Sequence, residues 1–219
     1  MNQNRKHFID EMNDLNIKVE RMGEEIGVIY NNLILALETN NKNVAASIIE
    51  EDKIINDIEV SINVDAYLLI AKQCPVASDL RRIITALKIA NDLERIADYA
   101  VNISKYIVKS TANNKEFRKV LISLADKVVI MLSDIIKAYH DENLELALKV
   151  CELDSTIDDL YKQKVKDLIK IGKANTDETA EAAIRALLVL KQLERAGDHI
   201  TNIAENIVYL VNGKRVELN

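Results

Sequence analysis

The apolar residues of the first forty positions recur at intervals of three and four, the period of a helix that buries one face. The series runs Phe8, Met12, Leu15, Val19, Met22, Ile26, Ile29, Leu33 and Leu37. It predicts a helix over about 5–39, which breaks at Asn40–Asn41. Similar patterns predict helices over about 44–74 and 75–110. The boundary between them falls at Pro75, because the residue before a proline is pushed out of helical geometry.

The pattern starts again after the polar stretch 111–114, which we interpret as a linker. Helices are predicted over about 115–139, from the turn at 140–143 to 171, and from 175–176 to just before Gly213. Gly172 is expected to end the fifth helix, and Asn175 with Glu178 forms a possible capping box. The sequence therefore predicts an all-α fold of two pseudo-symmetric three-helix bundles, with domains at 1–110 and 111–219.

An internal repeat supports this division. The segment 93–103 reads LERIADYAVNI and returns one hundred residues later, at 193–203, as LERAGDHITNI. Apolar positions of the two segments form matching stripes: Leu93, Ile96, Ala100, Ile103 and Ile107, then Leu193, Ala196, Ile200, Ile203 and Ile207. The chain is predicted to be one unit copied twice.

The repeat also preserves a ladder of oxygen ligands. Glu94, Asp98 and Asn102 follow one another at intervals of four, and residues that far apart share a helix face. The second half repeats them as Glu194, Asp198 and Asn202. The middle helices add a second pair to each half, Asp52 with Asn56 and Asp154 with Asp158. We expect the ladder to lie on the face turned away from the apolar seam, with the middle-helix pairs facing it.

Two interpretations of the ladder compete. An ordinary solvated surface would have Arg95 and Arg195 offset the acids through weak ion pairs. Carboxylates stacked about 5–6 Å apart repel one another, however, and a cation relieves that repulsion. We favour a metal site, because surface positions match between the halves while most buried positions around them have changed.

Oxygen ligands suit Mg²⁺, Mn²⁺ or Ca²⁺, and carboxylates also bind iron. His199 could add one nitrogen donor, although a lone histidine is more often structural. A di-iron carboxylate enzyme would need Glu followed three residues later by His in two helices, and neither His140 nor His199 meets that requirement. No catalytic triad, phosphate-binding glycine loop or HExxH motif appears. The residues predict a metal site without a reaction.

Composition narrows the class of protein. With 48% apolar residues, five Gly and one Pro, the chain has few strand or turn signals. The net charge of −6 and the dispersed basic residues argue against nucleic acid. No apolar run of about 18 residues and no signal core appear, so we expect a cytoplasmic chain. Cys74 and Cys151 lack CxxC partners and are interpreted as small buried hydrophobes.

The chain resembles the PhoU family of phosphate-transport regulators. The resemblance is carried by the two repeat segments and by 75–83, PVASDLRRI, and extends over essentially the whole chain. It implies surface metal clusters held by paired E/DxxxD motifs, with iron, zinc, manganese or magnesium as candidate ions. The matching residues are Asp52, Asn56, Glu94, Asp98, Asp154, Asp158, Glu194 and Asp198. Asn56 departs from the motif, so the first site is expected to bind metal more weakly.

The resemblance also implies a non-enzymatic role in phosphate homeostasis. Such a protein would link the ATPase subunit of the phosphate ABC transporter (PstB-like) to a phosphate-sensing histidine kinase (PhoR-like), would repress signalling when phosphate is plentiful, and would reach the membrane only through partners. Two alternatives stay open: a carboxylate-cluster metalloenzyme acting on phosphate compounds, and a metal-free helical scaffold. A homodimer is a further possibility, since long amphipathic helices readily self-associate.

Overall fold

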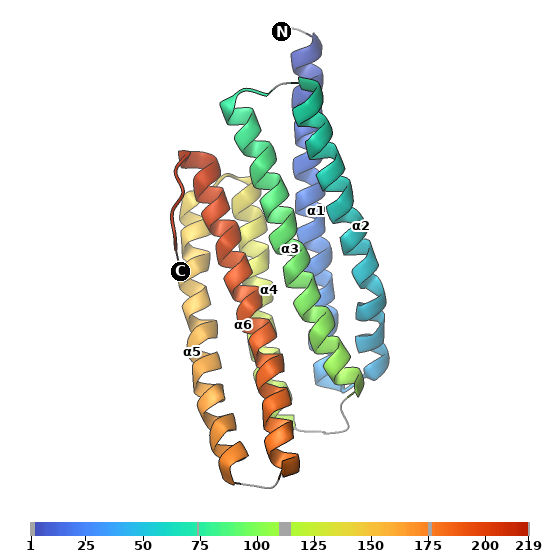
Figure 1. The fold of residues 1–219 in the computed structure, drawn as a ribbon, viewed down its shortest axis with the longest axis vertical. Helices are drawn as coiled ribbons and strands as arrows, with labels where there is room; N and C mark the ends of the chain where they lie inside the picture. Colours follow the sequence, from blue (N-terminus) through green and yellow to red (C-terminus); the bar gives the residue numbers. More distant parts are fainter. Residues whose placement is uncertain (1–2, 74, 110–114, 175–176, 219) are drawn as a thin grey trace.

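The computed structural model describes residues 3–73, 75–109, 115–174 and 177–218, which form six helices (Figure 1). These are α1 (Gln3–Thr39), α2 (Lys42–Gln73), α3 (Ala77–Lys109), α4 (Lys115–His140), α5 (Leu144–Ala174) and α6 (Asp177–Asn212). The predicted all-α fold is confirmed. The linker 111–114 and Asn175 of the capping box lie outside the described residues, and the domain boundary stays a prediction.

The first turn of each half is made in the same way. Asn40 ends α1 with a positive φ of 52°, and Asn41 Oδ1 accepts hydrogen bonds from the backbone N–H groups of Asn43 (2.9 Å) and Val44 (3.4 Å). Glu142 takes a φ of 49° after α4, and Asn143 Oδ1 accepts from Leu146 N–H at 3.1 Å. An asparagine cap therefore starts both α2 and α5.

The expected end of α5 at Gly172 is wrong, because the helix continues to Ala174. A glycine inside a helix costs only about 1 kcal/mol relative to alanine. A Cβ at Gly172 would lie in ordinary van der Waals contact with Ala183 Cβ, at 3.8 Å. Tertiary packing against α6 thus outweighs the local preference of glycine for a helix terminus.

The two three-helix bundles lie side by side and share one core (Figure 1). All nine apolar residues predicted for the α1 seam are buried, as are both predicted stripes of α3 and α6. α1 packs on α4 and α3 packs on α6, so the bundles contact each other through two helix pairs. Gly23 allows part of this approach, because a Cβ there would overlap the Ile136 side chain. None of the described helices combines the length and apolarity needed to cross a membrane.

Tyr30 ties α1 to α3 inside the first bundle. Its side chain is fully buried, and its hydroxyl donates a hydrogen bond of 3.0 Å to the Ile96 carbonyl oxygen. Burial raises the pKa of Tyr30, so the hydroxyl keeps its proton and remains a donor.

Tyr30→Phe is expected to lower the free energy of unfolding by about 1 kcal/mol, because the ring still fills its space while a buried hydrogen bond is lost. Urea unfolding followed by circular dichroism would measure the change. Tyr67→Phe is the matched control, since the Tyr67 side chain is 60% exposed. Equal effects of the two substitutions would contradict the structural role of the Tyr30 hydroxyl.

Candidate metal centre

Three carboxylates of the second half converge between α5 and α6. Asp158 comes from α5, and Glu194 and Asp198 come from α6. One oxygen of each lies within 4.8 Å of the others. This is the spacing that one hard cation bound by several carboxylates requires. The structure therefore brings together three of the four residues predicted for this half as a potential ligand set.

The fourth predicted residue, Asp154, is buried beside these three carboxylates. Only 7% of its surface is exposed. Its Oδ1 faces the backbone of Gly197 so closely that a Cβ at 197 would overlap it. The glycine in the sequence LERAGDH is thus explained by the approach of a carboxylate from α5. Sequence reasoning had given Gly197 no role.

Two buried oxygen atoms of this cluster lack hydrogen-bond partners among the described residues. They are Asp154 Oδ1 and Glu194 Oε2. Buried polar atoms are normally satisfied, so unsatisfied ones need an explanation. An acceptor-only atom inside a group of carboxylates fits a cation better than it fits another protein group.

The cluster raises the pKa values of its own acids. Burial, followed by repulsion from Asp198, Asp158 and Glu194, raises the pKa of Asp154 to about 7. Burial and then Glu194 raise the pKa of Asp198 as well. The protein holds these groups where their charged form is disfavoured, a pattern that is common at functional sites.

Two lysines partly neutralise the cluster from its sides. Lys162 Nζ donates to Asp158 Oδ2 at 2.8 Å, and Lys191 donates to Glu194 Oε1. Both are helix-surface pairs within one turn, and such pairs are weak. Two cations against four carboxylates leave an excess of negative charge, so the lysines do not replace a metal ion.

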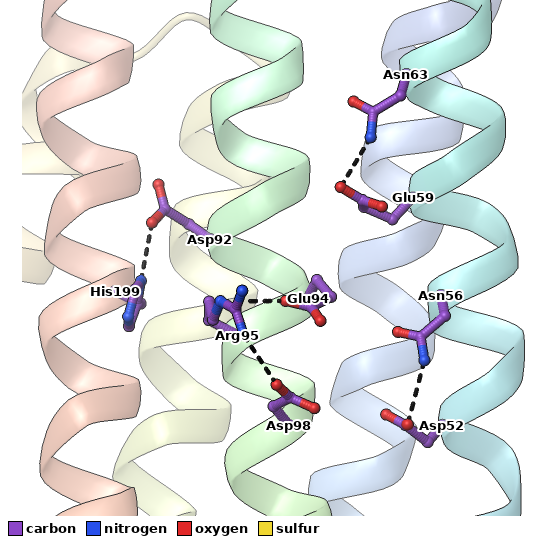
Figure 2. A network of polar contacts seen from close by, with 9 residues as sticks. All are labelled: Asp52, Asn56, Glu59, Asn63, Asp92, Glu94, Arg95, Asp98 and His199. Atoms are coloured by element: carbon purple, nitrogen blue, oxygen red, sulfur yellow. Dashed lines mark hydrogen bonds and ion pairs between the residues drawn. The ribbon is translucent and has the colours of Figure 1, made fainter.

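The first half has the same arrangement in a more open form (Figure 2). Glu94 on α3 faces Asp52 and Asn56 on α2. Asn56 Nδ2 donates to Asp52 Oδ2 at 3.2 Å, so the amide binds its neighbour. Arg95 Nη1 donates to Asp98 Oδ2 at 3.2 Å, and its Nε lies 3.4 Å from Glu94 Oε2. In the described residues of this half, no three carboxylates come as close as in the second.

Glu59 belongs to the first cluster but was not predicted. It stands three residues after Asn56 on α2, and Asn63 donates to its Oε1 at 2.8 Å (Figure 2). Burial raises the pKa of Glu94, and Asp98, Glu59 and Asp52 raise it further, while Arg95 lowers it. Glu59 thus supplies a carboxylate where Asn56 lacks one. The spacing of 52, 56, 59 and 63 along one helix face is the signal that could have found it.

The expected position of the acids needs two corrections. They lie between α2 and α3 and between α5 and α6, and the Glu194 side chain is only 12% exposed. The third residue of the ladder, Asn102, also lies away from the site. Four residues turn a helix by about 400°, so each step of four moves a side chain about 40° further around the helix. Asn102 instead donates to Gln192 at 3.3 Å, across the contact between α3 and α6.

His199 does not join the carboxylate cluster through its Nδ1. That atom lies 2.9 Å from Asp92 Oδ1, so the pair joins α6 to α3 (Figure 2). Its ring also packs against Tyr99, its counterpart in the repeat, with centroids 5.6 Å apart. Cys151 is half-buried, and burial raises its pKa to about 11, in keeping with an unreactive thiol. Cys74 lies outside the described residues.

Comparison with known proteins identifies the family. The sequence model of the PhoU domain matches the chain twice, over residues 19–107 and 121–207. The chain belongs to the PhoU family. A phosphate-specific transport system accessory protein PhoU homolog of Clostridium acetobutylicum is 37% identical over 98% of this chain and 99% of its own length. PhoU homolog 1 of Thermotoga maritima is 32% identical over 96% and 91%.

Two solved PhoU structures share the fold. The phosphate transport system regulatory protein PhoU of Streptococcus pneumoniae superimposes with a TM-score of 0.86 at 28% identity, covering 96% of this chain and 99% of that one. PhoU of Pseudomonas aeruginosa gives 0.85 at 28% identity, over 94% and 100%. The pseudo-symmetric pair of bundles is therefore the PhoU fold.

Asp154 makes the stability of the metal-free PhoU chain depend on pH. Its pKa rises from about 3.9 in an unfolded chain to about 7 when folded. The folded state thus binds the proton more tightly, and this group's contribution to stability is present below about pH 4 and is lost as the pH rises through 7. Asp154→Asn mimics the protonated form, so with a chelator at pH 8 its Tm should exceed wild type by about 2–4 °C, the shift that 1 kcal/mol produces in a chain of this size.

Calorimetry at pH 5 and pH 8 would measure this difference, which should be clearly smaller at pH 5, because only about one of the roughly three pH units that separate the two pKa values has then been crossed. The matched control is Asp159→Asn, which removes an exposed carboxylate from the same helix and should give a smaller gain in Tm at pH 8. A larger gain in Tm for Asp154→Asn at pH 5 than at pH 8 would show that the charged form of Asp154 does not destabilise the folded protein.

Proposed function

We propose that this protein is a non-enzymatic regulator of phosphate transport. The observation that carries the proposal is the match to a phosphate-specific transport accessory protein over 98% of this chain and 99% of that protein. Both repeats of this chain are included in that match. The name of the Streptococcus pneumoniae structure, a regulatory protein, supports the same class of function.

The architecture suits an adaptor between two partners. The fold presents two similar bundles, each with acidic side chains between its second and third helices. We assign the partners expected from the family resemblance: the ATPase subunit of the phosphate ABC transporter and the phosphate-sensing histidine kinase. Binding to both would repress signalling while phosphate is plentiful and would bring the chain to the membrane surface only through its partners.

The second-half cluster is assigned as a divalent metal site. Asp158, Glu194 and Asp198 supply oxygens within one coordination sphere, and Asp154 supplies a buried oxygen beside them. The donors are all carboxylates, which suits manganese or magnesium and also fits iron, while zinc is bound with fewer oxygens. A bound cation would offset the repulsion that raises the pKa of Asp154.

The first-half cluster is assigned as a weaker site. Asp52, Glu59, Glu94 and Asp98 are its carboxylates, and Arg95 already contacts two of them. Asn56 adds a neutral amide. A metal ion would have to displace the guanidinium from Glu94 and Asp98, which lowers the affinity for the ion.

Removal of charge from the second cluster should abolish its metal binding. The double substitution Glu194→Gln and Asp198→Asn is expected to lose the tightest bound manganese or iron in titration calorimetry and elemental analysis. It should also lose the rise in Tm that ions binding only the folded state produce in wild type. The matched control is Asp159→Asn with Glu181→Gln, which removes the same number of charges from exposed positions of α5 and α6.

Gly197→Ala is a second test, because its Cβ would displace Asp154 without removing a carboxylate. It should weaken metal binding, whereas Gly27→Ala should not, since nothing lies within 4 Å of a Cβ at that position. Retention of wild-type metal content by both the double variant and Gly197→Ala would favour a metal-free scaffold. Steady hydrolysis of phosphate esters by metal-loaded protein, lost on Asp198→Ala, would instead favour a metalloenzyme.

The adaptor role predicts phosphate-dependent association. The tagged full-length chain should retain the transporter ATPase and the sensor kinase from extracts of phosphate-replete cells and retain less of both after phosphate starvation. Deletion of the gene should release phosphate-responsive transcription from repression in replete medium. Absence of both effects would contradict the adaptor, whatever the metal measurements show.

A further inference from the structure

A polar cavity opens on the face that α2, α3 and α6 form together. Its volume is about 680 Å³, and α3 lies between the other two helices (Figure 1). The segment after α6 adds a further wall, and this segment is held to α6 because the Leu218 N–H group donates to Glu205 Oε1 at 2.8 Å. A cavity of this size holds a ligand as large as a nucleotide. We call it the asparagine cavity, after four of its lining residues: Asn63, Asn91, Asn202 and Asn206.

The internal repeat shows that the fold does not require these polar residues. The register aligns Asp52 with Asp154 on the middle helices and Leu93 with Leu193 on the third helices. In this register, three of the four asparagines and the lysine of the cavity have different counterparts in the other half. The pairs are Asn63 with Val165, Asn91 with Lys191, Asn206 with Tyr106 and Lys88 with Leu188. A bound ligand, not the packing of the bundle, explains a polar set that only one half possesses.

Two cations in the cavity wall have no acidic partner. Within the part of the chain that the structure describes, neither Lys88 on α3 nor Arg215 after α6 forms an ion pair. The Arg215 guanidinium lies over the ring of Tyr209, 5.8 Å from its centroid. Lysine and arginine both donate charge-assisted hydrogen bonds to phosphate oxygens. This part of the cavity is therefore suited to the phosphates of a ligand.

The acids of the cavity decide which kind of phosphate compound fits. They are Glu59, Asp92, Glu205 and Glu217. Glu59 accepts a hydrogen bond from Asn63 (Figure 2). Asp92 is paired with His199 (Figure 2). Four carboxylates against two cations would repel a bare chain of phosphates. Mg²⁺ in nucleotide sites is bound by one or two carboxylates together with the phosphates, so these charges favour a ligand that brings its own Mg²⁺.

The wall formed by α2 and α3 suits a purine base. Tyr67 lines the cavity and is 60% exposed, so its ring is open to a ligand. Aromatic side chains stack on nucleobases. Asn91 lies across the cavity on α3, and its side chain has no hydrogen-bond partner within the described residues. An asparagine amide presents a donor beside an acceptor, the pair that matches N6 and N7 of adenine.

We propose that the asparagine cavity binds an adenine nucleotide together with its Mg²⁺ ion. Tyr67 stacks on the base and Asn91 recognises its edge, while Lys88 and Arg215 hold the phosphates. The Mg²⁺ ion offsets the repulsion between the phosphates and the carboxylates of the cavity. The proposal concerns binding alone, without a reaction of the nucleotide, and it does not rest on the proposed regulatory function.

Titration calorimetry of the full chain with Mg²⁺-bound ATP would test the site. ATP is expected to bind at least about tenfold more tightly than adenosine or inorganic phosphate, because each of these makes only part of the contacts. Lys88→Gln and Arg215→Gln should each weaken ATP binding about tenfold, since each removes charge-assisted hydrogen bonds. Lys105→Gln and Lys214→Gln are the matched controls, because both lysines are exposed and lie outside the cavity wall.

The base is tested separately. Tyr67→Ala should weaken ATP binding, whereas Tyr67→Phe should retain it, because the second variant keeps the ring. Mg²⁺-bound UTP should bind at least about tenfold more weakly than ATP, since uracil lacks the N6 and N7 atoms that an asparagine recognises. Unaltered circular dichroism of all variants would show that they fold.

Several results would overturn the proposal. They are a wild-type chain that does not bind Mg²⁺-bound ATP, equal affinities for ATP and UTP, and binding that Lys88→Gln and Arg215→Gln leave unchanged. Glu194→Gln with Asp198→Asn should not affect nucleotide binding. Loss of binding in that variant would place the nucleotide at the metal cluster of the second half and would overturn the proposal as well.

Discussion

The main constraint on the second bundle is the crowding of carboxylates between α5 and α6. Four acids are held together against their mutual repulsion because the apolar seam beside them, including Ile157 and Leu193, is completely buried. Each such side chain contributes about 1.5–3 kcal/mol by leaving water, so the seam can hold the acids in place. Gly197 then permits Asp154 to approach α6. Core packing thus creates a site whose own charges oppose its formation.

Different side chains offset the repulsion between carboxylates in the two halves. In the first half, Arg95 contacts both Glu94 and Asp98, Asn56 is exposed, and one buried oxygen, Glu94 Oε2, lacks a hydrogen bond among the described residues (Figure 2). In the second half, Arg195 is exposed, two lysines approach from the sides, and two oxygens stay without hydrogen bonds among the described residues. Both clusters keep an excess of negative charge, since four carboxylates face one arginine in the first half and two lysines in the second. They differ in that the guanidinium contacts two acids at once, whereas each lysine pairs with one.

The sequence predicted the helices and the core because both follow from one periodicity. The nine-residue seam of α1 was identified in full, since an amphipathic helix shows its buried face directly. Glu59 and Gly197 were missed because their roles depend on a neighbouring helix. The approach of α5 explains Gly197, and the position of Glu94 explains Glu59. The outward placement of the acids was also inexact, because opposite the main seam a three-helix bundle has grooves as well as open surface.

The side of α2 that faces α3 and the side that faces outward differ in chemistry. Asp52, Asn56 and Glu59 lie between about 80° and 140° around the helix from Val64, so the residues assigned to the first cluster occupy a separate side. The outward side differs between the halves, because exposed Val60, Val64 and Leu68 of α2 correspond to exposed Lys162, Lys166 and Lys170 of α5. The inward side carries acids in both helices, Asp52 in α2 and Asp154 with Asp158 in α5. The repeat therefore keeps the inward chemistry of this helix alike in the two halves, while its outward side has diverged.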